Sequence, residues 1–254
     1  MEVYYGIVFF IFGLIFGSFY NVVGYRVPLK MSIISPSSHC PKCNHKLTAL
    51  ELIPVFSYLI QGGKCKKCGK KIPIFYPMFE LITGLLFLLT YIIFGISIDT
   101  VIGLIFVSLI LILIISDILY MHVPNILLII FGLPIFIIKV VLNGLNSIPV
   151  LLLNMFIPFI VLYIFKIFGD FIFKKESLGT GDINLMLIFG LVLGWKISLV
   201  SIFIASLLGL IGSLISLKNN NSHELPFVPY LGLSSFICLF ARVYIVAILE
   251  FLGF

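Results

Sequence analysis

The sequence predicts an all-α polytopic membrane protein, with about eight transmembrane helices and a small cytoplasmic zinc-binding loop domain between the first two. Three observations lead to this fold class. Of the 254 residues, 61% are hydrophobic and only 10% are charged, whereas about a quarter of residues are charged in soluble domains. Long apolar runs recur, and a run of roughly 18 residues crosses the hydrocarbon core as a helix. A hydrophilic segment with two cysteine pairs separates the first two runs.

Breaks at Pro, Gly, Asn and charged residues divide the apolar sequence into the predicted spans. The first run has no basic region before it and is too long for a signal-peptide core, so we expect a retained helix. A β-barrel is excluded because the runs do not alternate in polarity. The approximate spans are 3–23, 75–95, 98–118, 125–142, 148–168, 183–194, 196–217 and 229–252.

The sixth predicted span, 183–194, is too short to cross the membrane. Its length corresponds to a helix of about 18 Å, against the roughly 30 Å of the hydrocarbon core. Trp195 and Lys196 are natural interfacial anchors for its outer end. We therefore expect the other end, which carries Asp182, to be buried in the membrane.

The basic residues indicate the orientation of the chain. The net charge is +6, from 16 Lys+Arg against 10 Asp+Glu, and nine of the sixteen lie in the segment 24–74. The positive-inside rule places this segment in the cytoplasm, with both termini outside and the loops 169–182 and 218–228 inside. Lys166, Lys174, Lys175 and Lys218 agree with this orientation, whereas Lys139 and Lys196 lie near outer ends. The charge is thus a topology signal, and no nucleic-acid partner is expected.

The hydrophilic segment contains two C-x2-C pairs that predict a metal site. Cys40 and Cys43 are separated by 21 residues from Cys65 and Cys68. Four thiolates in this arrangement suit a tetrahedral structural Zn²⁺, which stabilises a segment too small for its own core. Disulfides or free thiols are the alternatives, but disulfides are rare in the cytoplasm. His39 and His45 are interpreted as loop residues and Cys238 as a packing residue.

Acidic residues within the apolar segments are candidates for function, because charge in hydrocarbon is unfavourable. Glu80, Asp117 and Asp182 remain after the residues in loops and at span ends are set aside. The predicted topology brings Asp117 and Asp182 into the membrane from the cytoplasmic side. Two adjacent carboxylates share a proton, so one can activate water while the other protonates a carbonyl oxygen. This is the chemistry of an aspartyl protease.

Two other interpretations of Asp182 stay open from the residues alone. The Gly-Thr-Gly-Asp sequence could be a helix entry with Asp182 as N-cap, or the two aspartates could form the ion site of a transporter. Gly179 and Gly181 are candidate substrate-binding residues, because glycines adopt positive φ angles and let another backbone approach closely.

At these residues the chain resembles the bacterial prepilin peptidases, also called type IV leader peptidases, which are intramembrane Gly-x-Gly-Asp aspartyl proteases. Segments 17–28, 51–59, 76–81 and 225–230 match the family pattern, together with the two C-x2-C pairs. Asp117 precedes Val123-Pro124-Asn125 by six residues, as in the family's first catalytic motif, and Asp182 matches the second. One departure is Asn184, where the family often carries Lys; a Lys that tunes the aspartate would be missing here.

The resemblance implies cleavage of the basic leader of type IV prepilins or pseudopilins after a Gly, with Asp117 and Asp182 as the catalytic pair. Many family members that keep the cysteine domain also methylate the new N-terminus with S-adenosylmethionine, whose binding residues no spacing here reveals. Glu80 is a candidate for a role in this half, and the alternative is a paired or snorkelling residue at the membrane interface. The implied division is a first helix 1–23, a tetracysteine domain 24–74 and a peptidase domain 75–254. The implied location is the bacterial cell membrane, with the site facing the cytoplasm.

Three competing interpretations make different predictions. A transporter would place the aspartates near the bilayer midplane, with a path open to both sides. A non-catalytic pilus-assembly scaffold would use the cysteine domain to dock partners and would tolerate Asp→Asn at both positions. A presenilin-like protease would carry Tyr before the first aspartate, where this chain has Ser116.

Overall fold

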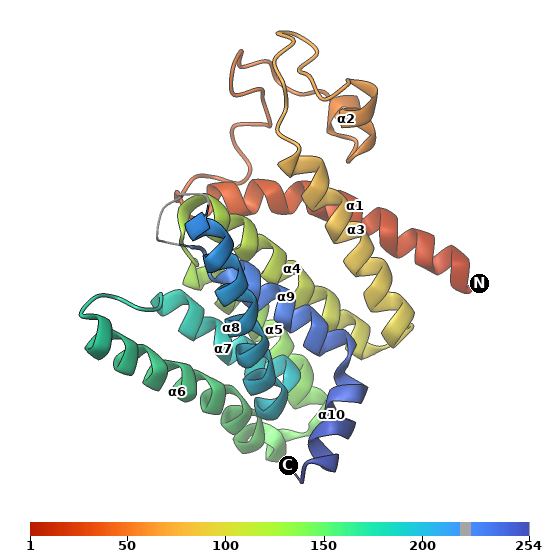
Figure 1. Ribbon diagram of the computed structural model, residues 1–254. Helices are drawn as coiled ribbons and strands as arrows, with labels where there is room; N and C mark the ends of the chain where they lie inside the picture. The colour runs from red at the N-terminus through yellow and green to blue at the C-terminus, as the bar shows by residue number, and fades with distance from the viewer. Residues whose placement is uncertain (219–224, 254) are drawn as a thin grey trace. The chain divides into compact units, whose positions relative to one another are not determined.

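The computed structural model describes residues 1–218 and 225–253 (Figure 1). Within these residues the chain is helical, and its only β-structure is two isolated bridges, His39 with Lys46 and Lys64 with Lys71. The prediction of an all-α protein is confirmed. The helices are α1 (Glu2–Arg26), η1 (Ala49–Leu52), α2 (Phe56–Ile60), α3 (Phe75–Phe94), α4 (Ile98–Tyr120), α5 (Asn125–Asn143), η2 (Leu145–Ser147), α6 (Ile148–Phe173), α7 (Thr180–Leu193), α8 (Trp195–Lys218), α9 (Val228–Phe240) and α10 (Arg242–Phe251).

Each predicted apolar segment contains a helix, but a count of eight crossings is not confirmed. In the described residues, six helices are long and apolar enough to cross a membrane: α1, α3, α4, α5, α6 with η2, and α8. Helix α7 is too short, as expected from the sequence. The predicted last span is broken into α9 and α10, which meet at 81°. Arg242 stands at this break, and the turn removes its charge from a continuous apolar helix.

The chain divides into two compact units, Met1–Ser116 and Asp117–Phe254, so the division falls inside α4. The predicted boundaries of the domains 1–23, 24–74 and 75–254 stay predictions. Much of the predicted cytoplasmic loop 218–228 lies outside the described residues, because residues 219–224 are not among them.

In the first unit, α1 packs closely along α3 (Figure 1). Glycines on α1 allow this approach: a Cβ on Gly13 would lie 2.7 Å from Gly84 Cα, and one on Gly17 would lie 2.8 Å from Glu80 Cα. Small residues four positions apart let two membrane helices come into backbone contact. The hairpin of α1 and α3 therefore forms the base from which the tetracysteine segment, residues 27–74, extends.

In the second unit, α7 packs against α5, α6, α8 and α9. These neighbours bury ten of its fourteen residues, including all of the last six, 188–193. The far end of α7 is held by Lys139 of α5, whose Nζ donates to the carbonyl oxygens of Leu191 at 2.5 Å and Val192 at 3.1 Å. A cation at a helix C-terminus satisfies carbonyl groups that have no partner within the helix.

Candidate functional site

Asp117 lies near the end of α4 and is almost completely buried, with 5% of its surface exposed. Its Oδ2 accepts a hydrogen bond from the backbone N–H of Val228 at 3.0 Å. Val228 is the first residue of α9, and a helix N-terminus presents N–H groups that favour a carboxylate. The segment 225–230, matched in the sequence only as a motif, thus leads into a backbone donor for the first aspartate.

Asp182 is the third residue of α7 and is 8% exposed. The N-cap is Gly179, so the interpretation of Asp182 as the N-cap is wrong. Its carboxylate lies close enough to Asp117 for the two charges to interact. The structure therefore brings the two predicted residues together at the end of α4 and the start of α7.

The two candidate glycines differ in their surroundings, and neither adopts the positive φ that the sequence suggested. Gly179 has φ −65° and is exposed, and a Cβ there would lie 3.3 Å from Asp182 Oδ2. A Cβ on Gly181 would lie 2.5 Å from Val123 Cβ. Gly181 is thus required for close packing of α7 against the segment that follows Asp117, and it is a side chain rather than a backbone that approaches it.

A second contact joins the same two segments. Asn184 Nδ2 donates to Asn125 Oδ1 at 3.1 Å. Asn125 begins α5, directly after Val123 and Pro124. The residue that departs from the family pattern, the fifth of α7, therefore connects this helix to the start of α5.

The loop before Asp182 is folded back on the end of α6, a feature that the sequence analysis missed. Asp170 Oδ1 accepts the Ser177 N–H at 2.6 Å, and Lys166 Nζ donates to Glu176 Oε1 at 3.0 Å. The charge of Lys166, whose side chain is 11% exposed, also acts favourably on Asp182. Lys166, Asp170 and Glu176 were visible in the sequence, but nothing in their spacing indicated that they hold this loop against the end of α6.

The four predicted metal ligands come together in the first unit. The Sγ atoms of Cys40, Cys43, Cys65 and Cys68 all lie within 4.8 Å of one another, with Cys40 to Cys68 and Cys43 to Cys65 at 3.9 Å. Sulfurs bound tetrahedrally to one zinc ion at about 2.3 Å lie roughly 3.8 Å apart. The cluster therefore has the size of a zinc site.

Each cysteine pair lies on a turn of the same construction. The Asn44 N–H donates to Cys40 O and the Gly69 N–H donates to Cys65 O, and both donors have a positive φ. The backbone N–H groups of Lys42 and Cys43 lower the pKa of the Cys40 thiol to about 6. Those of Cys68 and Lys67 likewise lower the pKa of Cys65. Each turn thus stabilises a thiolate at its first cysteine, the form in which cysteine binds a metal.

The two histidines of this segment make other contacts, in agreement with their interpretation as loop residues. His45 Nε2 lies 3.3 Å from Glu51, and His39 Nδ1 lies 2.9 Å from Ser37 O. Within the described residues, the cysteines form the metal-binding group without them.

Glu80 anchors the tetracysteine segment to α3. Its Oε2 accepts the Val55 N–H at 2.7 Å, and its carboxylate also interacts with Ser18. Val55 has φ 61° and ψ −52°, a positive-φ conformation that a β-branched residue rarely adopts. The carboxylate thus holds a strained turn of the segment on the helix hairpin, which gives Glu80 a structural partner.

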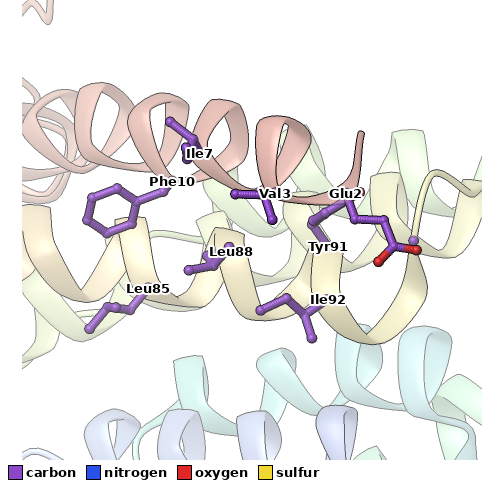
Figure 2. A pocket seen from close by; sticks show the side chains of 10 residues that line it. Glu2, Val3, Ile7, Phe10, Leu85, Leu88, Tyr91 and Ile92 are labelled. Carbon is purple, nitrogen blue, oxygen red and sulfur yellow. The ribbon is translucent and has the colours of Figure 1, made fainter.

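A groove lies at the other end of this hairpin, where α1 begins and α3 ends (Figure 2). Its lining is apolar except for Glu2 and Tyr91; Figure 2 shows Val3, Ile7, Phe10, Leu85, Leu88 and Ile92 along the two helices. Such a lining does not suit a cofactor with an adenine, a ribose and a charged amino acid group. We assign no cofactor to this groove.

Comparison with known proteins identifies the family. Residues 11–94 match the bacterial peptidase A24 N-terminal domain, and residues 104–214 match the type IV leader peptidase family. A Bacillus subtilis protein named prepilin leader peptidase/N-methyltransferase is 38% identical over 229 residues, which are 89% of this chain and 90% of that protein. The chain belongs to the type IV leader peptidase family. The resemblance predicted from the motifs is thereby confirmed.

Other members of this family carry the same name. The Myxococcus xanthus protein is 35% identical over 82% of this chain and 62% of its own length. The Neisseria gonorrhoeae protein is 30% identical over 89% of this chain and 87% of its own length. No solved structure matches the chain.

Proposed function

We propose that this chain is an intramembrane aspartyl endopeptidase that removes the basic leader from type IV prepilins or pseudopilins after a Gly. Its active site would face the cytoplasm, in the bacterial cell membrane. The observation that carries this proposal is the buried pair of Asp117 and Asp182, formed where α4 ends and α7 begins in a type IV leader peptidase. The names of the curated relatives support prepilin as the substrate.

The two carboxylates would act as a coupled acid and base. One accepts a proton from water, whose oxygen attacks the scissile carbonyl carbon, while the other donates a proton to the carbonyl oxygen. Collapse of the tetrahedral intermediate breaks the C–N bond, and the leaving amine takes up a proton from the pair. Because the two groups share protons, neither residue is assigned a fixed role. The Val228 N–H orients the Asp117 carboxylate throughout these steps.

The substrate backbone would approach the pair at Gly179. This glycine is exposed and borders the Asp182 carboxylate, so a larger residue would stand between the carboxylate and an approaching strand. Gly181 would contribute indirectly, by its packing against Val123.

The tetracysteine cluster would hold one structural Zn²⁺, with Cys40, Cys43, Cys65 and Cys68 completing its coordination. The names of the relatives further support methylation of the new N-terminal amine. S-adenosylmethionine, when bound, would supply the methyl group. No residue of this chain is assigned to that cofactor.

Mass spectrometry of a synthetic prepilin incubated with the purified, lipid-reconstituted protein tests the proposal. We expect the wild type to release the leader after Gly, and the product to gain one methyl group when S-adenosylmethionine is added. Asp117→Asn and Asp182→Asn should each lower the cleavage rate by about 1000-fold or more. Asp99→Asn is the matched control, because Asp99 lies on α4 as well but is exposed in its first turn.

The outcomes separate the competing functions. Cleavage that survives both substitutions would contradict the catalytic pair. Absence of cleavage by the wild type, with a substrate validated on a curated relative, would favour a scaffold or a transporter. Cleavage without methylation would leave the peptidase in place and remove the second activity.

A further inference from the structure

A second cavity, this one with several polar residues in its lining, is in the same unit as the aspartates, at the opposite end of α7. Its volume is about 300 Å³, and it is lined by residues from α6, α7, α8 and α10. The polar members are Asn154, Trp195, Lys196, Arg242 and Glu250. Leu193, Val246 and Leu249 contribute apolar walls. The cavity thus combines charged groups with an apolar surface.

The charges in this cavity favour an anion. Two cations and one carboxylate line it, which gives an excess of one positive charge. Across residues 1–218 and 225–253, neither Lys196 nor Arg242 has a carboxylate within 4.0 Å. The Lys196 ammonium lies 5.7 Å from the centre of the Trp195 ring. Both cations are therefore available to an oxyanion that enters from outside the protein.

The surroundings of the cavity are those of a helix end at a membrane surface. Trp and Lys side chains are typical of the level of the lipid headgroups. The 81° turn between α9 and α10 directs α10 away from the direction of α9. Val243, Tyr244 and Ile248 of α10 are exposed apolar residues, as expected for a helix that lies in the interface.

We propose that this cavity binds the headgroup of an anionic membrane phospholipid of the phosphatidylglycerol type. Lys196 and Arg242 would bind the phosphodiester, since both are donors suited to phosphate oxygens. Glu250 would accept a hydrogen bond from a headgroup hydroxyl, and the first acyl carbons would contact Leu193 and Val246. The bound lipid would fix α10 and the turn before α8 at the membrane surface.

Trp195 provides the measurement, because it is the single tryptophan of the chain and it lines the cavity. The detergent-purified protein is titrated with dihexanoyl phosphatidylglycerol while its tryptophan fluorescence is recorded. Dihexanoylglycerol, with the same tails and no phosphate, and inorganic phosphate are titrated in parallel. We expect a saturable change with the phospholipid, and at least tenfold weaker responses to the other two.

Two double variants sharpen the titration. Lys196→Gln with Arg242→Gln should weaken phospholipid binding by about 100-fold or more, since it removes two charge-assisted hydrogen bonds that each contribute at least about a factor of ten. Lys196→Arg with Arg242→Lys keeps both charges and should retain binding. Lys175→Gln, an exposed lysine of the loop before α7, is the control for loss of charge elsewhere. Circular dichroism checks that each variant is folded.

Three results would overturn the proposal. An equal response to dihexanoylglycerol would show apolar partitioning, and an equal response to inorganic phosphate would show a small-anion site. Unchanged affinity in the folded glutamine double variant would show that the cations do not bind the headgroup. If that variant does not fold, loss of binding in the charge-retaining variant would contradict an electrostatic site.

Discussion

The four cysteines are positioned by two short turns, whereas the two aspartates are positioned by the packing of helices far apart in the sequence. Each turn needs only its own backbone hydrogen bonds and one residue of positive φ to place two thiols. Asp117 depends on α9 for a hydrogen-bond donor. Asp182 depends on the close contact of Gly181 with Val123 and on the hydrogen bonds that hold the preceding loop against α6. The metal site should therefore be most sensitive to substitutions within its own two turns. The aspartate pair should also respond to substitutions in the other segments that pack around it.

Apart from substitution of the aspartates themselves, the largest effect in these two regions is expected for removal of one metal ligand. Cys65→Ser should abolish stoichiometric zinc binding, with affinity lowered by about 100-fold or more, because a structural site needs all four ligands. Metal analysis of the purified protein measures this directly. Cys238→Ser is the control, since Cys238 is a buried packing residue of α9. If the Cys65 variant keeps one zinc per chain, the cluster is not the metal site.

The metal site was easier to predict from the sequence than the aspartate pair, because local turns position the cysteines and long-range packing positions the aspartates. The spacing of Cys40, Cys43, Cys65 and Cys68 was sufficient to predict their cluster, because a C-x2-C turn determines its own geometry. The helices were predictable because apolar length reports burial in lipid. The prediction that Asp117 and Asp182 lie close together rested on the predicted orientation of the chain in the membrane and on the family resemblance.

Other features left no sequence signal. The donor to Asp117 is a backbone N–H, which every residue but proline carries, so the residue type of Val228 did not reveal it. The contact of Gly181 with Val123 depends on how α7 packs, which the sequence does not show. The sequence suggested instead that Gly181 adopts a positive φ, which it does not. The break between α9 and α10 also left no signal, because the hydropathy of residues 229–252 indicates a single span.

The second largest effect is expected where α7 meets Val123. Gly181→Ala would place a Cβ 2.5 Å from Val123 Cβ, which must displace the first turn of α7. A displacement of about 1 Å at a catalytic group lowers rates by up to about 100-fold, and prepilin cleavage kinetics measure the loss.

Two variants test whether steric contact is the cause of this loss. Gly209→Ala is the matched control, because the nearest atom to its Cβ would be Phe227 at an ordinary 3.5 Å. Adding Val123→Gly to Gly181→Ala removes the clash and should restore part of the rate. Full activity of Gly181→Ala alone would show that the aspartate pair does not depend on this packing.

A smaller effect is expected at the far end of α7. Lys139→Met removes the ammonium that donates to Leu191 O and Val192 O, and should lower the free energy of unfolding by about 2 kcal/mol. Denaturant titration in detergent measures this change. Lys139→Arg should keep most of the stability, and Lys175→Met, at an exposed site, should change it little. Equal stability of the two methionine variants would show that the Lys139 contacts contribute nothing.

The smallest effect is expected for the hydrogen bond between Asn184 and Asn125, which lies at the surface of the site. Its loss should cost about 1 kcal/mol, which corresponds to a roughly fivefold lower cleavage rate if the bond holds Asp182 in place. Asn184→Ala, Asn125→Ala and the double variant form a cycle in which the double variant should lose no more than either single one. Asn184→Lys supplies an ammonium donor to Asn125 Oδ1 in place of the amide, and should keep the rate within about twofold. Additive losses in the cycle would show that the two residues act independently, and that the aspartate pair is fixed by Gly181 and Val228 without this bond.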